Sequence, residues 1–140
     1  MLIHGTTIDI SGCGVLLLGP SGAGKSDLAL RLIADGALLV ADDQTLVAVV
    51  DGYLHASGPG IISGLIEVRG VGLLPAPVKA ATRLRLAVQL VDSPPERMPE
   101  PRTWSLPGHV EPCVPLTALA PFEASALAKL RRALAVVPNA

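Results

Sequence analysis

Residues 19–26, which read GPSGAGKS, constrain this chain more than any other segment. They match the pattern G-x-x-x-x-G-K-[ST], in which glycines let backbone N–H groups converge on phosphate oxygens. An apolar run, Gly14–Leu18, precedes this loop, and Lys25–Ala34 follows it with apolar residues at helical spacing. Because a helix N-terminus adds partial positive charge at the same point, strand, loop and helix together predict a phosphate-binding P-loop.

The loop residues have distinct expected roles in binding a nucleoside triphosphate. Lys25, one of only three lysines in the chain, would neutralise the β- and γ-phosphates, and the Ser26 hydroxyl would ligate Mg²⁺. The bland alternative is a glycine-rich turn with an incidental lysine. ATP and Mg²⁺ are the expected cofactors, and the residues expected to contact the nucleotide are Gly19, Pro20, Ser21, Gly22, Ala23, Gly24, Lys25 and Ser26.

The rest of the chain mixes strand and helix patterns. Strands are predicted at Thr6–Ile10, Leu38–Ala41 and Arg83–Val91, and a hairpin at Thr45–Val50 and Tyr53–Ser57. Phe122–Val136 has the pattern of an amphipathic helix opened by Pro121. Ser93–Pro107 contains five prolines and is expected to be irregular and exposed, while glycine-rich Gly58–Gly72 is left unassigned. With no repeat and no boundary, residues 1–140 are predicted to form one α/β domain.

The composition limits the kinds of partner that this chain is expected to bind. The chain is 50% hydrophobic, carries a net charge of −1 and is 2% aromatic. Such a chain offers neither a basic surface for a polyanion nor a stacking platform for single strands, so nucleic-acid binding is not expected. No signal peptide is recognisable, and the apolar runs fall short of the ~18 residues that a membrane span needs. A soluble cytoplasmic protein is therefore predicted.

Two acids follow the predicted strand Leu38–Ala41 directly. Phosphoryl transfer to a hydroxyl needs a carboxylate that accepts a proton or steers the nucleophile. Asp42 and Asp43 would lie at the carboxyl edge of the sheet, where α/β proteins bind ligands. The alternative for both is a solvated turn that opens the hairpin.

A second charged island lies inside the apolar stretch Leu65–Leu74. Glu67 and Arg69 are two residues apart and would share a face if this stretch is a strand. They are candidates for the site, and a structural ion pair between them is the alternative. His4, immediately before Gly5, would begin the first strand; a lone histidine in such a place is more often structural than catalytic.

These segments, in this order, resemble the C-terminal catalytic domain of HPr kinase/phosphorylase. That family opens the domain with a histidine-glycine pair, as His4-Gly5 does here, and continues with a GxSGxGKS loop. A strand ending VADD matches Val40–Asp43, and a signature close to LLEIRGLGII matches Leu65–Leu74. The resemblance is close over residues 2–75 and faint beyond them.

The resemblance implies an α/β, P-loop-containing nucleotide-binding fold with a mixed sheet, similar to the nucleotide-binding domain of phosphoenolpyruvate carboxykinase. It implies an ATP-dependent kinase that phosphorylates a serine of HPr or an HPr-like protein, regulating the phosphotransferase system and carbon metabolism. It also implies a homo-oligomer, a hexamer in the family. By the same resemblance the catalytic residues are His4, Lys25, Asp42 and Arg97, the Mg²⁺ ligands are Ser26 and Glu67, and Asp43 and Arg69 lie beside them.

Two departures from the family pattern shape these expectations. The chain begins at the catalytic domain, as in the truncated forms of alphaproteobacteria. The family's VPVRPGRN-like segment, which is tied to dephosphorylation, is replaced by VPLTALAP at Val114–Pro121, without the arginine and asparagine. A kinase with weak or absent phosphorylase activity is therefore predicted.

Two other functions compete with this one. A small-molecule P-loop kinase would use the same loop, but such kinases usually need a lid with several arginines. A non-catalytic ATP-sensing module is favoured by the altered segment at Val114–Pro121 and opposed by the intact Lys25, Ser26, Asp42 and Glu67. An assay of ATP turnover with candidate protein acceptors separates the three.

Overall fold

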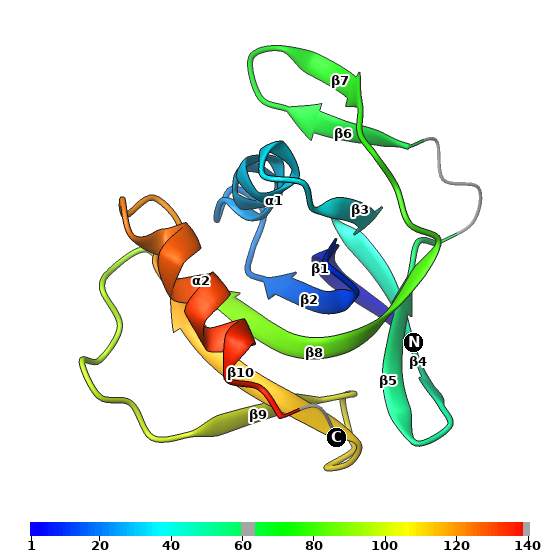
Figure 1. The fold of residues 1–140 in the computed structure, drawn as a ribbon, viewed down its shortest axis with the longest axis vertical. Coiled ribbons are helices and arrows are strands. Elements are labelled where there is room, and N and C mark those ends of the chain that lie inside the picture. Colours follow the sequence, from blue (N-terminus) through cyan, green and yellow to red (C-terminus); the bar gives the residue numbers. More distant parts are fainter. Residues whose placement is uncertain (60–63, 139–140) are drawn as a thin grey trace.

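A computed structural model describes residues 1–59 and 64–138 of the chain (Figure 1). Its strands are β1 (Leu2–Ile10), β2 (Cys13–Leu18), β3 (Leu38–Ala41), β4 (Gln44–Val50), β5 (Tyr53–Ser57), β6 (Leu65–Val68), β7 (Gly72–Pro75), β8 (Ala81–Leu90), β9 (Arg102–Ser105) and β10 (Cys113–Leu119). Its helices are α1 (Lys25–Ala34) and α2 (Ala126–Ala135). Figure 1 shows both helices on the same side of the long strands β2 and β8, and the β6–β7 hairpin at the top, where Ile66 of β6 joins the core on the helix side.

Eight of the strands form one mixed sheet. β2 pairs with β1 on one side and with β8 on the other, and β1 and β8 are also linked through β4 and β5, so these five strands close into a ring. β3 adds to β1, and β10 and β9 extend the sheet beyond β8. The pairs β2–β8 and β8–β10 are parallel and the others antiparallel. The expectation of an α/β fold with a mixed sheet is confirmed.

Strand direction decides where a site can form. β2, β8 and β10 run parallel, and β3 runs the same way because both β2 and β3 are antiparallel to β1. Their carboxyl ends therefore meet at one edge, where the chain continues into residues 19–24, 42–43, 91–94 and 120–123. β1 begins at the same edge. Ligands of open α/β sheets bind at such an edge.

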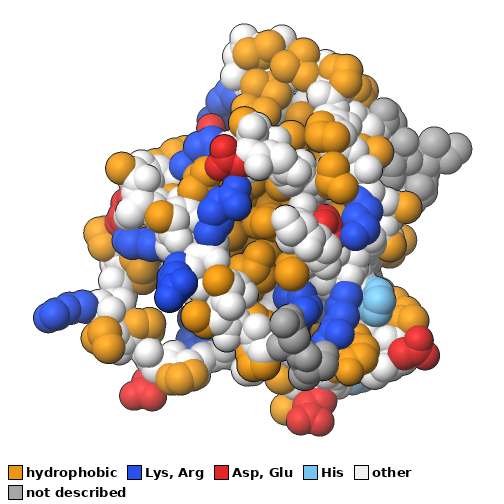
Figure 2. Space-filling view, in the orientation of Figure 1, with side chains coloured by type: hydrophobic (Ala, Val, Ile, Leu, Met, Phe, Trp, Pro, Cys, Tyr) orange, Lys and Arg blue, Asp and Glu red, His pale blue; other side chains and the backbone are white. Residues whose placement is uncertain are grey.

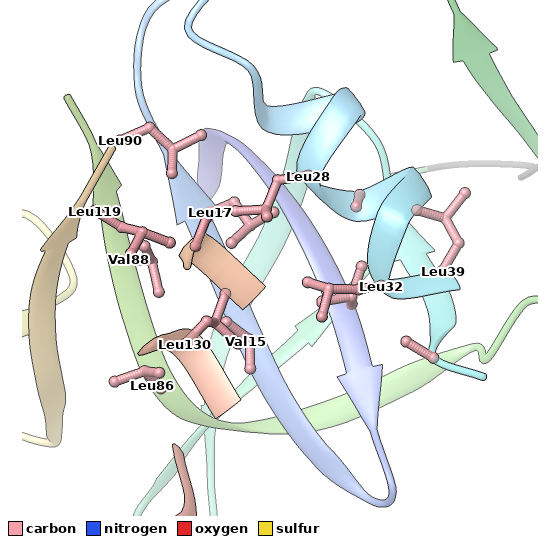
Figure 3. Packing of buried hydrophobic residues seen from close by; sticks show 14 of the residues in the cluster. Val15, Leu17, Leu28, Leu32, Leu39, Leu86, Val88, Leu90, Leu119 and Leu130 are labelled. Atoms are coloured by element: carbon pink, nitrogen blue, oxygen red, sulfur yellow. The ribbon is translucent and has the colours of Figure 1, made fainter. Parts of the chain in front are cut away.

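The strands of the ring separate two hydrophobic cores. On the helix side, Val15 and Leu17 of β2 pack against Leu28 and Leu32 of α1, together with Leu130 of α2 (Figure 3). Leu16, which lies between Val15 and Leu17, faces the other core with residues of β4 and β5. Because β2 is buried on both faces, its sequence is a continuous apolar run and does not alternate with polar residues.

The outer surface is mixed in charge on the face that Figure 2 shows, and apolar side chains gather over the β6–β7 hairpin at its top. Val71 and Leu73 of this hairpin are each about two-thirds exposed. Neither α1 nor α2 is long and apolar enough to cross a membrane, and no other helix occurs in residues 1–59 and 64–138.

Local patterns predicted α1, β3 and β5 with their observed bounds and missed several other elements. β9 interrupts Ser93–Pro107, which was expected to be irregular, because it pairs antiparallel with β10. β10 itself was not predicted, and its parallel partner β8 is distant in sequence. Glycine-rich Gly58–Gly72 contains β6 and the start of β7, while its residues 60–63 lie outside the described residues.

The prediction that a helix begins at Phe122 was wrong. Residues 121–125 form turns, and α2 begins only at Ala126, after Ser125 as its N-cap. The Pro121 carbonyl accepts a hydrogen bond from Arg31 on α1, and the Ala120 carbonyl accepts one from Glu123 N–H at 3.3 Å. These long-range and local bonds hold the chain in a turn that its amphipathic pattern does not reveal.

Candidate active site

The glycine-rich loop links β2 to α1 with a backbone that its glycines make possible. Gly22 and Gly24 have φ values of 84° and 105°, in the left-handed region that favours glycine. Gly24 also caps α1, since its carbonyl accepts the Leu28 N–H at 2.9 Å. A Cβ at Gly24 would lie 2.9 Å from Cζ of Phe122, so both space and torsion require glycine there. The loop thus places the N-terminus of α1 at the carboxyl edge of the sheet.

Lys25 is held against the loop that it follows. Its side chain is buried, and Nζ donates hydrogen bonds to the carbonyls of Gly19 at 2.7 Å and Pro20 at 3.0 Å. An ammonium group has three N–H donors, so one is left over for a phosphate oxygen. Because the buried charge is compensated by carbonyl dipoles, Lys25 is pre-positioned at the loop.

Asp42 faces this loop from the end of β3. Its Oδ1 accepts hydrogen bonds from Ser26 Oγ at 2.8 Å and Thr6 Oγ1 at 3.1 Å. Its Oδ2 lies at 3.5 Å from the Glu67 N–H, at the limit of a hydrogen bond. One carboxylate oxygen is therefore fully used for positioning, and the other is left weakly engaged at the pocket.

Thr6 was not singled out from the sequence, although it is fully buried beside Asp42. Its Oγ1 accepts the Asp43 N–H at 3.1 Å and donates its proton to Asp42. The available sequence signal was its position two residues after His4 on a strand, which puts both side chains on one face. The hydroxyl joins β1 to the acidic end of β3.

His4 and Asp43 form an exposed pair next to this carboxylate. His4 Nε2 and Asp43 Oδ1 are 2.9 Å apart, and both side chains are at least half exposed. Asp43 has a φ of 68°, and its carbonyl accepts the Gly5 N–H at 2.9 Å. The backbone turn therefore directs the Asp42 and Asp43 side chains to different partners, Asp42 to the loop and Asp43 to His4.

Lys25, Asp42 and Asp43 border a cavity of about 500 Å³. Its lining comprises Ser21, Gly22, Gly24, Lys25, Ser26, Asp27, Leu30, Asp42, Asp43, Glu67, Val68, Arg69 and Phe122. Glu67 and Arg69 both line it, and no ion pair joins them in the part of the chain that the structure describes. The structural ion pair considered for these two residues is therefore not formed.

Two predicted catalytic residues do not line this cavity. One is His4, which pairs with the lining residue Asp43, and the other is Arg97. Arg97 is exposed, lies between β8 and β9, and is absent from the lining of both cavities beside the glycine-rich loop. Phe122 is the opposite case, since the sequence assigned it to a helix and the structure places it at the loop.

The oxygen atoms at the cavity suit a hard cation. Ser26 supplies a hydroxyl, and Asp42 and Glu67 supply carboxylates from two further elements. Within residues 1–59 and 64–138, no three His, Cys, Asp or Glu side chains are grouped closely enough to hold a metal ion by themselves. Mg²⁺ is commonly bound by one or two carboxylates together with substrate phosphates, so this donor set fits Mg²⁺ arriving with a nucleotide.

A glycine-rich loop between strand and helix, with a lysine and a carboxylate facing it across a cavity, defines an α/β protein built to hold a phosphorylated ligand at its sheet edge. The chain belongs to the family of HPr serine kinase C-terminal domains, whose pattern it matches over residues 1–100.

Related proteins agree with this membership. The HPr kinase/phosphorylase of Clostridium kluyveri is 50% identical over 72 residues, which are 51% of this chain and 23% of that protein. The HPr kinase/phosphorylase of Clostridium novyi is 47% identical over 75 residues, 54% of this chain and 24% of that protein. The matched part therefore spans only about a quarter of these relatives. The structure of the Hpr(Ser) kinase/phosphatase from Coxiella burnetii matches with a TM-score of 0.77 and 28% identity, covering 96% of this chain and 88% of that one.

Proposed function

We propose that this chain transfers the γ-phosphoryl group of ATP to a serine hydroxyl of the phosphocarrier protein HPr or an HPr-like protein, as a cytoplasmic regulator of the phosphotransferase system and carbon metabolism. The observation that carries the proposal is the Asp42 carboxylate. One of its oxygens is fastened by Ser26 and Thr6, and the other faces the cavity beside the Lys25 loop.

The proposed reaction follows from this arrangement. The free backbone N–H groups of the glycine-rich loop and the remaining Lys25 N–H bind the phosphates and stabilise the charge that develops on them. Pro20 has no N–H, and the Ala23 N–H already donates to the Pro20 carbonyl at 3.0 Å. The acceptor serine oxygen forms a bond to the γ-phosphorus while the bond between that phosphorus and the β,γ-bridging oxygen breaks, and ADP leaves. The serine proton passes to Asp42 Oδ2, the less engaged oxygen.

Mg²⁺, when bound with the nucleotide, would neutralise charge on the phosphates. Ser26 and Glu67 are the proposed ligands. The Ser26 hydroxyl donates a hydrogen bond to Asp42 Oδ1, and this leaves its lone pairs for a cation. His4 is proposed to assist through Asp43, its hydrogen-bond partner, and Arg69 would face the acceptor or the phosphates from β6–β7. Arg97 would need a rearrangement of the β8–β9 segment to take part.

Two further features are proposed from the family. The nucleotide would bind as in the phosphoenolpyruvate carboxykinase-like domain, and the protein would assemble into a homo-oligomer, a hexamer by resemblance. The exposed apolar side chains of the β6–β7 hairpin, Val71 and Leu73, are a surface suited to such an interface. Light scattering of the purified chain tests the assembly, and a monomeric mass would contradict it.

The decisive experiment incubates the purified chain with ATP, Mg²⁺ and HPr and detects phosphoserine by mass spectrometry. Wild type should phosphorylate HPr, whereas Lys25→Ala should lose detectable transfer while keeping its circular dichroism spectrum. Asp42→Asn should lose transfer yet still bind ATP, because the proton acceptor is gone and a negative charge near the γ-phosphate is removed.

Asp51→Asn is the matched control for Asp42→Asn. Asp51 is an exposed acid in the β4–β5 turn, at the end of β4 that is opposite to Asp42. This variant should retain full activity. ATP binding with no phosphoserine would indicate the ATP-sensing module, and turnover with small acceptors only would indicate a small-molecule kinase. Undiminished transfer by Lys25→Ala would contradict the P-loop assignment.

A further inference from the structure

A second cavity, of about 760 Å³, lies on the other side of the glycine-rich loop. It is bordered by the segments that follow the three parallel strands β2, β8 and β10. The lining residues are Pro20, Ser21, Gly22, Ala23, Leu90, Val91, Asp92, Ser93, Pro94, Ala120, Pro121, Phe122 and Glu123. Figure 1 shows the elements next to these segments, namely α1, α2 and β8.

This cavity adjoins the phosphate-binding cavity. Ser21, Gly22 and Phe122 line both of them. The carboxylates Asp42 and Glu67 line only the first. A ligand whose terminal phosphate lies near Asp42 and Lys25 can therefore extend past Gly22 into the second cavity without leaving the edge of the sheet.

Phe122 is the side chain that divides the two spaces. It is the only phenylalanine in the chain and is 71% exposed, although a large apolar side chain is normally buried. One edge of its ring contacts the loop, since a Cβ at Gly24 would lie 2.9 Å from Cζ. Such a ring offers an open face at the loop, and a planar heterocycle can stack on it.

The turn that carries Phe122 is fastened on both sides. Arg31 of α1 donates to the carbonyl of Pro121, and Val91 N–H donates to the Leu119 carbonyl at 3.0 Å, which ties the segments after β8 and β10 together. Glu123 is paired with Lys129 at 2.8 Å. The backbone that carries Phe122 is therefore held in place before any ligand binds, so little backbone ordering is needed when one arrives.

The charge of the second cavity argues against another phosphate. Among the described residues that line it there is no Lys, Arg or His, and its two charged residues are Asp92 and Glu123. With Glu123 engaged by Lys129, Asp92 is the acceptor left for an amino or ring N–H group. Apolar walls with an aromatic face and one acceptor suit a neutral, planar, N–H-bearing ring.

We infer that the second cavity holds the purine base and ribose of the nucleotide, with the base stacked on Phe122 and an N–H of the base directed to Asp92. This inference rests on the proposed function, because it presumes that the triphosphate occupies the glycine-rich loop. It adds the nucleoside subsite to that function and assigns base stacking to the turn between β10 and α2 and base hydrogen bonding to the segment after β8.

The test compares two probes, ATP and inorganic tripolyphosphate, by titration calorimetry in the presence of Mg²⁺. Both share the phosphate chain, and only ATP carries a base. Phe122→Ala and Phe122→Leu should weaken ATP binding by about tenfold or more while changing tripolyphosphate affinity less than about twofold. Phe122→Tyr should bind ATP like wild type, because it keeps the ring. Asp92→Asn should weaken ATP by a smaller factor and leave tripolyphosphate unchanged.

Met98→Ala is the matched control, since Met98 is an apolar side chain that is 85% exposed and lines neither cavity. It should bind both probes like wild type. An unchanged ratio of ATP to tripolyphosphate affinity in Phe122→Ala would overturn the inference while leaving the phosphate site intact. Equal weakening of both probes would also overturn it, because Phe122 would then act only by supporting Gly24. If wild type bound neither probe, the proposed function would itself be wrong and the inference with it.

Discussion

Two neighbouring threonines illustrate how the site is built at the scale of single residues. Thr6 and Thr7 are both fully buried on β1, and their side chains point to opposite faces of the strand. Thr6 donates to Asp42, whereas Thr7 shares a hydrogen bond with Thr45 at 3.0 Å on the other side. Only the Thr6 hydroxyl is bonded to a carboxylate of the candidate site, so substitutions of Thr6 and Thr7 should affect catalysis differently.

Thr6→Val should lower kcat for phosphoryl transfer by roughly tenfold, because the lost hydrogen bond lets the Asp42 carboxylate rotate. KM for ATP should change little, since the loop and Lys25 are untouched. Thr6→Ser keeps the hydroxyl and should restore most of the rate. Steady-state kinetics of these variants and of Thr7→Val tests whether Thr6 orients Asp42. An equal loss of kcat in Thr7→Val would show that Thr6 contributes only to packing.

A substitution of Glu67 tests the proposed Mg²⁺ site, again at the scale of a single residue. Glu67→Gln keeps the shape of the side chain but removes the charge that would help to hold Mg²⁺, so the Mg²⁺ concentration giving half-maximal activity should rise several-fold. Ser26→Ala should act in the same direction. Glu96→Gln, an exposed acid outside both cavities, is the control. A Mg²⁺ titration that is identical for wild type and Glu67→Gln would exclude Glu67 as a ligand.

At the scale of elements, the chain places each function on a separate segment. The loop before α1 carries the proposed phosphate-binding groups, the end of β3 carries the acids, and the β6–β7 hairpin places Glu67 and Arg69 in the lining of the cavity. β10 holds the stretch in which the family's arginine and asparagine are replaced. Leu116–Leu119 pair with Ala87–Leu90 of β8, so this stretch is part of the sheet.

The replaced segment leads to a prediction about the reverse reaction. Phosphate attack on phosphoserine needs groups that hold inorganic phosphate, and the side chains of Thr117–Pro121 supply no cation for it. The wild-type chain, incubated with serine-phosphorylated HPr, Mg²⁺ and phosphate, should release pyrophosphate much more slowly than it consumes ATP in the forward direction. Equal rates in a coupled pyrophosphate assay would show that the segment is dispensable.

At the scale of the whole molecule, a buried acid on β1 joins distant parts of the sheet. Asp9 is 2% exposed and accepts hydrogen bonds from Thr82 at 2.6 Å, Lys79 at 3.0 Å and the Gly12 N–H at 2.8 Å. Burial acts to raise its pKa, and the bonds from Thr82, Lys79 and Gly12 outweigh burial and hold the pKa below its ordinary value of 3.8.

This network predicts how stability depends on pH. Because the folded-state pKa of Asp9 is depressed, its ionised form stabilises the fold above the unfolded value of 3.8, and this contribution is lost as pH falls through the folded pKa. Asp9→Asn should lower the free energy of unfolding at pH 7 by about 2 kcal/mol. In urea titrations the difference in free energy of unfolding between wild type and Asp9→Asn should become smaller at strongly acid pH. The control Asp51→Asn should have the same free energy of unfolding as wild type at every pH. A difference in free energy of unfolding that stays constant with pH would contradict the proposed dependence of stability on the Asp9 pKa.

The elements that could be predicted from the sequence are those that local rules specify. The glycines of residues 19–24 permit the positive-φ backbone of the loop, and α1 follows from the spacing of its apolar residues. The expected role of the acids after β3 follows from the rule that ligands bind at the carboxyl edge. The family was recognisable because its motifs fall in these local segments. Arg97 shows the limit of such transfer, since a motif match does not state where an exposed segment lies.

Contacts between residues far apart in the chain were decided only by the tertiary structure. The Thr6–Asp42 hydrogen bond, the contact of Phe122 with Gly24, and the pairing of β10 with β8 and β9 leave no periodic trace in the sequence. Each depends on strand register and on a turn held by a partner from another element, as Arg31 holds Pro121. The sequence by itself predicted a phosphate-binding loop at residues 19–26. Tertiary packing decided which hydroxyl orients the acid and which ring borders the loop, because such choices are set by long-range packing and not by local backbone preference.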